Sequence, residues 1–259
     1  MHHRTEKQII IGLLSLVVFF GFFFVLLLFS NQQPQKVPSP PVAVPSAIEE
    51  RAELKDLEVE FADFFEIRKF GTYDAVALVQ NPNLEYGGRE VQYEFIFYGV
   101  NDTELLKVPG KAFILPKHAR YIIEQAIRVP EKPVRVELSL YRIDWQRLVP
   151  FTPWVPELSE LNLIRDEAKR TTSLSGVVRN TSPYNLKNVE VQSALFDPKS
   201  ARAVAGGKTN MQDLLRDSAR FFEISWPYVV DRDLTIDAKV ESNFFENSNF
   251  IREYGLDPL

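Results

Sequence analysis

Histidine is the residue type that most limits the chemistry available to this sequence. The 259 residues contain three histidines and no cysteine, and only His118 lies beyond the first three positions. A nucleophilic triad needs a base that titrates near neutrality, which is usually histidine. One histidine without cysteine also cannot supply the four ligands of a typical structural zinc site. We therefore expect a protein that is not an enzyme, with no catalytic residue, no metal site and no cofactor, and we interpret His118 as an ordinary surface or edge histidine.

A second motif, Gly206-Gly207-Lys208-Thr209, has the ending of a phosphate-binding P-loop. That loop needs a further glycine five residues before the last one, so that backbone amides can wrap around phosphate. Arg202 occupies this position, and the motif follows a predicted strand of a β domain. We interpret it as a hairpin loop and exclude a nucleotide site.

Acidic residues in predicted turns are the remaining candidates for ligands. Asp197, Asp231 and Asp233 have the side chains that calcium prefers, but no run of three or four alternating carboxylates accompanies them. They are more typical of solvated turn aspartates. Glycosylation sequons begin at Asn101 and Asn180, and they matter only in a glycosylating host.

Aromatic side chains in the C-terminal tail, from residue 242 onward, are the candidates for binding a partner. They are Phe244, Phe245, Phe250 and Tyr254. The tail either docks on its own domain or is held out for another protein, and the sequence leaves both alternatives open.

The element that would position everything else is the apolar run over residues 9–29. As a helix, this run would extend about 31 Å, which matches the ~30 Å hydrocarbon core of a bilayer. It is longer than the core of a cleaved signal peptide, and no Ala-x-Ala site follows it. We predict a transmembrane helix over residues 9–30, with the lipid bilayer as partner of residues 9–29. Arg4 and Lys7 favour residues 1–8 as a short cytoplasmic tail, which places the bulk of the chain outside the cytoplasm.

The segment over residues 31–48 is rich in proline and contains no aromatic residue. Closely spaced prolines favour extended polyproline II, so this segment is predicted to be a stalk between the bilayer and the rest of the chain. The formal net charge is −5, and this mildly acidic balance argues against nucleic acid as a partner.

Beyond the stalk, the sequence alternates in the manner of β-strands. Apolar side chains occupy every second position over residues 91–97, 134–140 and 234–240, and over 189–195 with Ser193 as the exception. Turn residues such as Asn81-Pro82-Asn83 and Gly87-Gly88 separate these runs. The pattern predicts an all-β chain of antiparallel sandwiches.

An internal duplication organises these strands, with a spacing of 98–100 residues read directly from the sequence. Residues 73–81 match 172–180, and both stretches end at an asparagine before a turn that contains proline. Positions 91–98 correspond to 189–196, 114–122 to 214–222, and 134–140 to 234–240. In this alignment Ser218 is the counterpart of His118, and Phe245 that of Trp145. Four matches in the same order predict two copies of one β module.

The first copy, with Asn81-Pro82-Asn83 after its apolar strand, resembles the WHy domain of the LEA14-like proteins. The second, with residues 174–182, 189–197 and 214–222, is similar to the bacterial FxLYD domain, although it lacks Asn-Pro-Asn. These resemblances imply two tandem immunoglobulin-like antiparallel β-sandwich domains in an extracytoplasmic setting, and they bring no catalytic residue. We expect the first sandwich over residues 49–149, a proline-rich join over 150–156, and the second sandwich with its aromatic tail over 157–259.

Together these features predict a non-enzymatic, single-pass membrane protein of the cell envelope. Its two sandwiches would act as a spacer and scaffold for an envelope protein partner, in the manner of an accessory of a surface, pilus or secretion assembly. The LEA14-like resemblance implies an alternative, which is a stress or desiccation protector at the membrane.

Overall fold

The computed structural model describes residues 43–44, 54–68, 71–148, 155–230 and 233–251. These residues form an all-β structure of antiparallel strands, as the alternating pattern predicts. Residues 39–259 belong to one compact unit, and residues 1–38 to another. The predicted transmembrane helix lies outside the described residues, and within the described ranges no helix has the length and apolar character of a membrane span.

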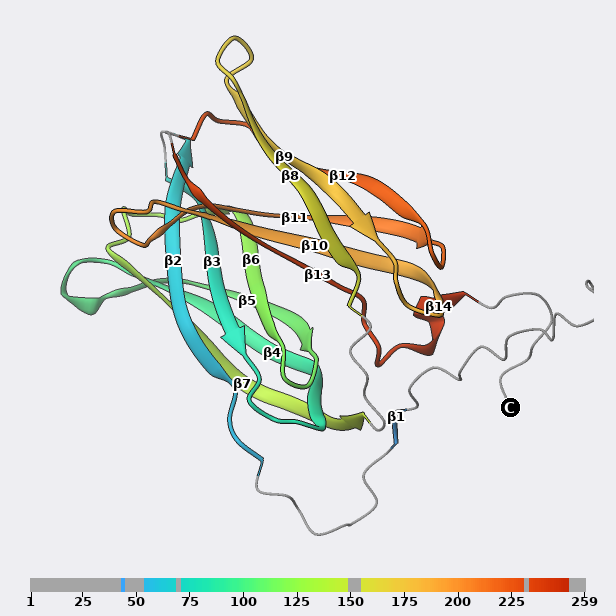
Figure 1. Cartoon of the computed structure of the whole chain (residues 1–259). Helices are drawn as coiled ribbons and strands as arrows, with labels where there is room; N and C mark the ends of the chain where they lie inside the picture. The colour runs from blue at the N-terminus through green and yellow to red at the C-terminus, as the bar shows by residue number, and fades with distance from the viewer. Residues whose placement is uncertain (1–42, 45–53, 69–70, 149–154, 231–232, 252–259) are drawn as a thin grey trace, which may run out of the picture. The chain divides into compact units, whose positions relative to one another are not determined.

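The first half of the chain, which comprises the described residues 43–44 and those between 54 and 148, forms two sheets (Figure 1). Sheet A has the order β1-β7-β4-β5 and sheet B the order β2-β3-β6. The strands are β1 (Ala43–Val44), β2 (Glu58–Arg68), β3 (Thr72–Gln80), β4 (Tyr86–Tyr98), β5 (Glu104–Ile114), β6 (Ala119–Arg128) and β7 (Arg135–Leu148).

Sheets A and B face each other across an apolar core. Alternate residues of β4, including Tyr93, Phe95 and Phe97, point into it from sheet A. Ala75 and Ala77 of β3 meet them from sheet B. The alternation over residues 91–97 therefore has its expected cause, because successive side chains of a strand point to opposite faces.

The second half, residues 155–251, repeats this plan with sheet C (β12-β9-β8) and sheet D (β11-β10-β13, with β14 paired to β10). The strands are β8 (Glu157–Asp166), β9 (Thr171–Arg179), β10 (Asn185–Phe196), β11 (Ala203–Leu214), β12 (Ala219–Trp226), β13 (Thr235–Glu241) and β14 (Phe250–Ile251). Gly207 lets the two sheets approach closely, since a Cβ atom there would lie 2.5 Å from Ile224 Cγ2.

The interpretation of residues 206–209 as a hairpin loop was wrong, because all four residues lie within the strand β11.

The same asparagine closes a turn in both halves. Asn81 Nδ2 donates to the carbonyl oxygens of Tyr86 (2.8 Å) and Leu115 (3.0 Å). Asn180 Nδ2 donates to the equivalent oxygens of Tyr184 (2.7 Å) and Leu214 (3.0 Å). Both asparagines are fully buried. The matched bonds give the sequence duplication a structural counterpart, and they explain why asparagine is kept at both positions.

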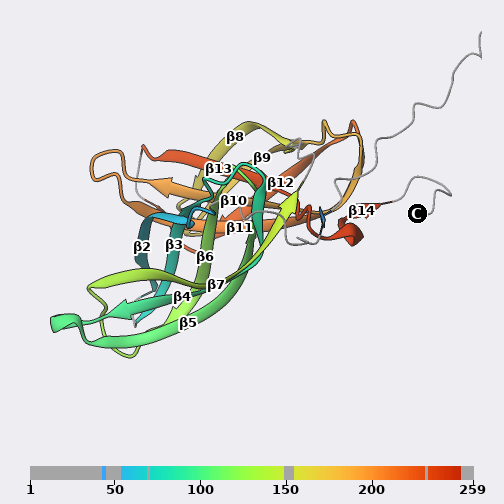
Figure 2. The same ribbon diagram turned by 90° about the horizontal axis from the view of Figure 1, so that it is seen from below.

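Sheets B and D pack against each other and join the two halves (Figure 2). Val76, Tyr121 and Ile123 of sheet B form one apolar cluster with Ala194 of β10 and Ala203 of β11. As a result, the seven residues from Tyr73 to Val79 in the interior of β3 are all buried. Antiparallel sheets usually leave one face in water, so this burial reflects the second half covering the outer face of sheet B.

Polar contacts accompany this apolar interface. The backbone N–H of Tyr121 donates to Gln192 Oε1 (3.0 Å), and its hydroxyl donates to Asp237 Oδ2 (2.7 Å). Near the other end, Arg202 and the backbone N–H of Ala203 donate to the carboxylate of Asp63. These directional bonds fix the register of one half on the other.

The predicted stalk contributes two residues to the fold. Ala43 pairs with Leu148 and Val44 with Arg147, which places β1 at the edge of sheet A. The two residues lie inside the 31–48 segment, so at this point that segment is paired with the folded unit.

Candidate functional site

His118, the histidine considered for chemistry in the sequence, takes part in a turn. His118 is half-buried, and its Nδ1 lies 2.8 Å from the carbonyl oxygen of Pro116. Its backbone carbonyl accepts from the N–H of Asn81, as that of Ser218 does from Asn180, so both residues complete the same turn. No group of three or more potential ligands for a metal ion occurs among the described residues.

Asp197 is a turn aspartate, as expected. Its carboxylate accepts from the backbone N–H of Lys199 and from the hydroxyl of Ser200, both at 2.9 Å. Hydrogen bonds to the charged form lower the pKa of this carboxyl, with the bond from Lys199 as the largest cause. Asp231 lies outside the described residues. The sequon at Asn180 is inaccessible in the folded chain, because that side chain is buried and fully engaged.

The aromatic candidates in the C-terminal tail separate into two groups. Phe244 and Phe245 are buried in an apolar cluster with Leu115 and Leu148 of the first half. The ring of Phe245 also contacts Gly87, where a Cβ atom would lie 2.6 Å from the ring. Phe250 belongs to β14, which pairs with Leu186 of β10, and Tyr254 lies outside the described residues. The start of the tail thus packs on the first half through Phe244 and Phe245, and it also pairs with its own half through β14, as the first sequence alternative expects.

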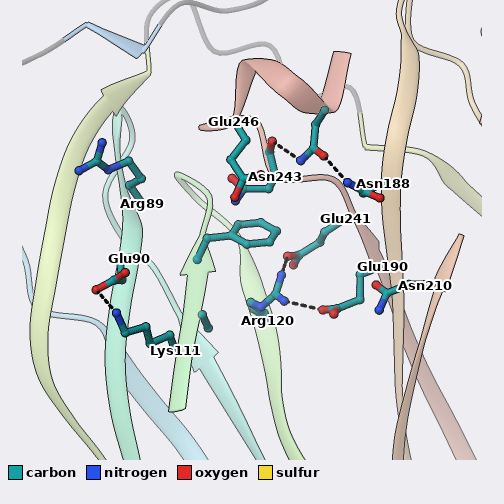
Figure 3. A pocket seen from close by; sticks show the side chains of 13 residues that line it. Arg89, Glu90, Lys111, Arg120, Asn188, Glu190, Asn210, Glu241, Asn243 and Glu246 are labelled. Atoms are coloured by element: carbon teal, nitrogen blue, oxygen red, sulfur yellow. Dashed lines mark hydrogen bonds and ion pairs between the residues drawn. The ribbon is translucent and has the colours of Figure 1, made fainter. Parts of the chain in front are cut away.

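Above this cluster lies a polar cavity of about 370 Å³ between the two halves (Figure 3). Its lining side chains come from β4 (Arg89, Glu90), β5 (Ala112, Lys111, Phe113), β6 (Arg120), β10 (Asn188, Glu190), β11 (Asn210), β13 (Glu241) and the segment after β13 (Asn243, Glu246, Asn249). The first-half residues come from the edge strands β5 and β6 and from β4, which pairs with β5. The register of sheet D aligns Asn210, Glu190 and Glu241 in one row across three strands.

Arg120 lines this cavity beside Glu190 and Glu241 and is buried (Figure 3). Its guanidinium bonds to Glu190 and to Glu241, the latter at 2.5 Å, and it stacks over the ring of Phe113 at 4.1 Å. Burial raises the pKa of the Glu241 carboxyl, and the opposing charge of Arg120 only partly offsets this. The cluster joins strands of both halves through charge-assisted hydrogen bonds.

Amide side chains form the upper wall. Asn188 Nδ2 donates to Asn249 Oδ1 (2.8 Å), and Asn249 Nδ2 donates to the carbonyl oxygen of Asn243 (2.9 Å). Asn243 Nδ2 in turn donates to Glu246 Oε1 (3.0 Å). This chain of bonds ties the start of the tail to β10 and keeps the cavity wall in place.

Sequence reasoning missed this cavity entirely. Arg120 and Glu241 are 121 residues apart, and no motif connects them. A weak signal was present, because an arginine in the strand of residues 119–123 stands among apolar residues and needs an acidic partner.

Comparisons with known proteins give little further information. No protein-family model matches the chain, and no curated protein matches it. Among solved structures, the chain is similar to red sea bream transglutaminase at a TM-score of 0.22 and 9% sequence identity, over 74% of this chain and 30% of that chain. A similarity this low carries no argument about function.

Proposed function

We propose that this protein is a non-enzymatic, membrane-anchored scaffold of the cell envelope that presents two fused immunoglobulin-like β-sandwiches as one rigid body. The anchor is the apolar run over residues 9–29, with the N-terminus in the cytoplasm. An envelope protein is the proposed partner, reached through strand edges or the C-terminal tail.

The interface between sheets B and D is the observation that supports this proposal. Its apolar cluster, the Tyr121 bonds and the Arg120 cluster each contain residues from both halves. A rigid body on a fixed anchor suits presentation at a set distance from the bilayer. A protector that acts by weak, nonspecific contacts has no need of such a fixed arrangement.

Rigidity can be tested directly because the chain contains no cysteine. Two exposed positions, Glu131 in the first half and Lys199 in the second, are replaced by cysteine and spin-labelled in the full chain. We expect double electron–electron resonance to give one narrow distribution of the distance between the two spin labels. A broad distribution, as from two independently moving domains, contradicts the proposal.

Orientation is tested by protease treatment of intact cells after the outer surface has been made permeable. We expect residues 39–259 to be digested if they lie outside the cytoplasm. Complete protection of this part under those conditions would rule out the proposed orientation.

A further inference from the structure

We propose that the polar cavity around Arg120 is a binding site for a neutral saccharide of one or two sugar rings. All residues that line the cavity lie between Arg89 and Asn249, so saccharide binding there requires neither the membrane anchor nor a protein partner. The volume of the cavity, about 370 Å³, lies in the range of ~300–1,000 Å³ that is typical of small-molecule sites.

The charges that line this cavity are largely compensated within the protein. Arg89 pairs with Asp144 at 2.5 Å, Lys111 pairs with Glu90 at 3.0 Å, and Arg120 pairs with both Glu190 and Glu241. A strongly charged ligand would therefore have to break an existing pair to gain one of its own. This arrangement favours a ligand without net charge.

The walls nevertheless retain hydrogen-bonding capacity. Asn210 is exposed in the cavity, and its amide makes no hydrogen bond to any described residue. Glu246 accepts one bond from Asn243 and is otherwise open to solvent. Lys111 has three donors and uses one of them on Glu90. The cavity wall thus offers both donors and acceptors, and a hydroxyl group can serve both because it donates and accepts.

Two buried atoms of the lining also lack a partner within the described part of the protein. They are Arg120 Nε and Glu241 Oε1. Buried polar atoms without a hydrogen bond are uncommon in native proteins and call for a physical reason. Arg120 Nε is a donor and Glu241 Oε1 is an acceptor, so a hydroxyl group, which both donates and accepts, has the chemistry that each atom lacks. Saccharides are uncharged ligands that carry a hydroxyl group on most of their carbon atoms.

The test uses the full chain in a detergent that has no sugar headgroup. Saturation-transfer NMR is recorded with maltose, cellobiose and N,N′-diacetylchitobiose as neutral probes, and with glucosamine and glucuronate as charged ones. We expect millimolar binding of at least one neutral probe. No transfer to any neutral probe, or transfer only to charged ones, overturns the inference.

Matched variants locate the site. Asn210→Ala removes an exposed amide in the cavity, whereas Asn162→Ala removes an exposed amide on β8 of sheet C. We expect Asn210→Ala to weaken binding about fivefold, as the loss of one neutral hydrogen bond implies, and Asn162→Ala to leave it unchanged. Equal affinities in the two variants would place the saccharide elsewhere and refute the assignment. A failure here leaves the spin-label and protease results intact, so it is distinguishable from failure of the proposed function.

Discussion

At the scale of single residues, the duplicated asparagines are the clearest link between sequence and fold. Asn180 makes two bonds through its amide nitrogen, and its Oδ1 accepts from the backbone N–H of Ser182 (3.0 Å) and from the Ser182 hydroxyl (2.6 Å). No other side chain of this size combines two donors with an acceptor in this geometry.

Replacement of this asparagine should therefore be costly. Asn180→Ala removes the Nδ2 donor from the buried carbonyl oxygens of Tyr184 and Leu214 and leaves the backbone N–H of Ser182 without its acceptor, so we expect the free energy of unfolding to fall by about 3 kcal/mol. Urea denaturation measures the change. Asn162→Ala is the matched control, with an expected change within about 0.5 kcal/mol because that side chain is exposed. A similar loss in both variants would contradict the role given to the turn.

Asp74 is a buried carboxyl that makes the stability of the fold depend on pH. It is 2% exposed, and its Oδ1 accepts from the backbone N–H of Ala126 at 2.7 Å. Burial is the largest cause that raises the pKa of this carboxyl to about 6, from 3.8. Between these two pH values the folded state holds a proton that the unfolded state has lost. Stability therefore falls as pH rises from about 4 to about 6, and the loss persists above that range.

Asp74→Asn should remove this pH-dependent loss. Relative to the wild type, we expect the variant to gain up to about 3 kcal/mol in unfolding free energy between pH 4 and pH 7. Urea denaturation across this pH range provides the measurement, and exposed Asp56→Asn serves as the control. If the difference between Asp74→Asn and wild type stays constant with pH, the carboxyl does not titrate as described.

At the scale of elements, β11 shows how one strand serves two interfaces. Gly207 faces sheet C, where a Cβ atom would lie 2.5 Å from Ile224 Cγ2 and 3.1 Å from the Trp226 ring. Gly206 faces the first half, where a Cβ atom would lie 3.2 Å from Val76 Cβ. Its carbonyl oxygen also accepts from Trp226 Nε1 (2.9 Å).

These neighbouring glycines offer a matched pair of substitutions. We expect Gly207→Ala to lower the unfolding free energy by about 2 kcal/mol through overpacking of the second core. Gly206→Ala should cost less than about 1 kcal/mol, because the nearest atom is at a nearly acceptable distance. Thermal unfolding followed by circular dichroism ranks the two, and the reverse order would show that sheets C and D are less tightly packed.

Much of this element structure was predictable from the alternating runs. The runs over residues 91–97 and 134–140 correspond to β4 and β7 because each strand covers one core and turns its other face outward. The contact between sheets B and D was not predicted, although the continuous apolar run at Ala75–Val79 is typical of a strand covered on both faces. The sequence could not predict the ion pairs of Arg120 with Glu190 and Glu241, because these residues meet only when the two halves dock.

At the scale of the whole molecule, the Arg120 cluster joins the halves through buried charge. Arg120→Met leaves Glu241 buried without its counter-charge, so we expect a loss of about 3–5 kcal/mol in unfolding free energy. The double variant Arg120→Met with Glu241→Leu should recover part of this loss, because an apolar pair of similar volume avoids the desolvation penalty, whereas Glu190 stays without its counter-charge. Urea denaturation compares the variants. A double variant no more stable than the single one would mean that the pair contributes through geometry rather than charge balance.

The docking of sheet B on sheet D also has a consequence for how the protein is made. When the first half leaves the ribosome, Val76, Tyr121 and Ile123 form an apolar surface whose cover has yet to be synthesised. At about 5–20 residues per second, the second half of roughly 100 residues follows only after several seconds. Throughout that interval the nascent chain exposes the apolar outer face of sheet B to its surroundings. Until β10 and β11 arrive, only groups outside the first half can cover this face.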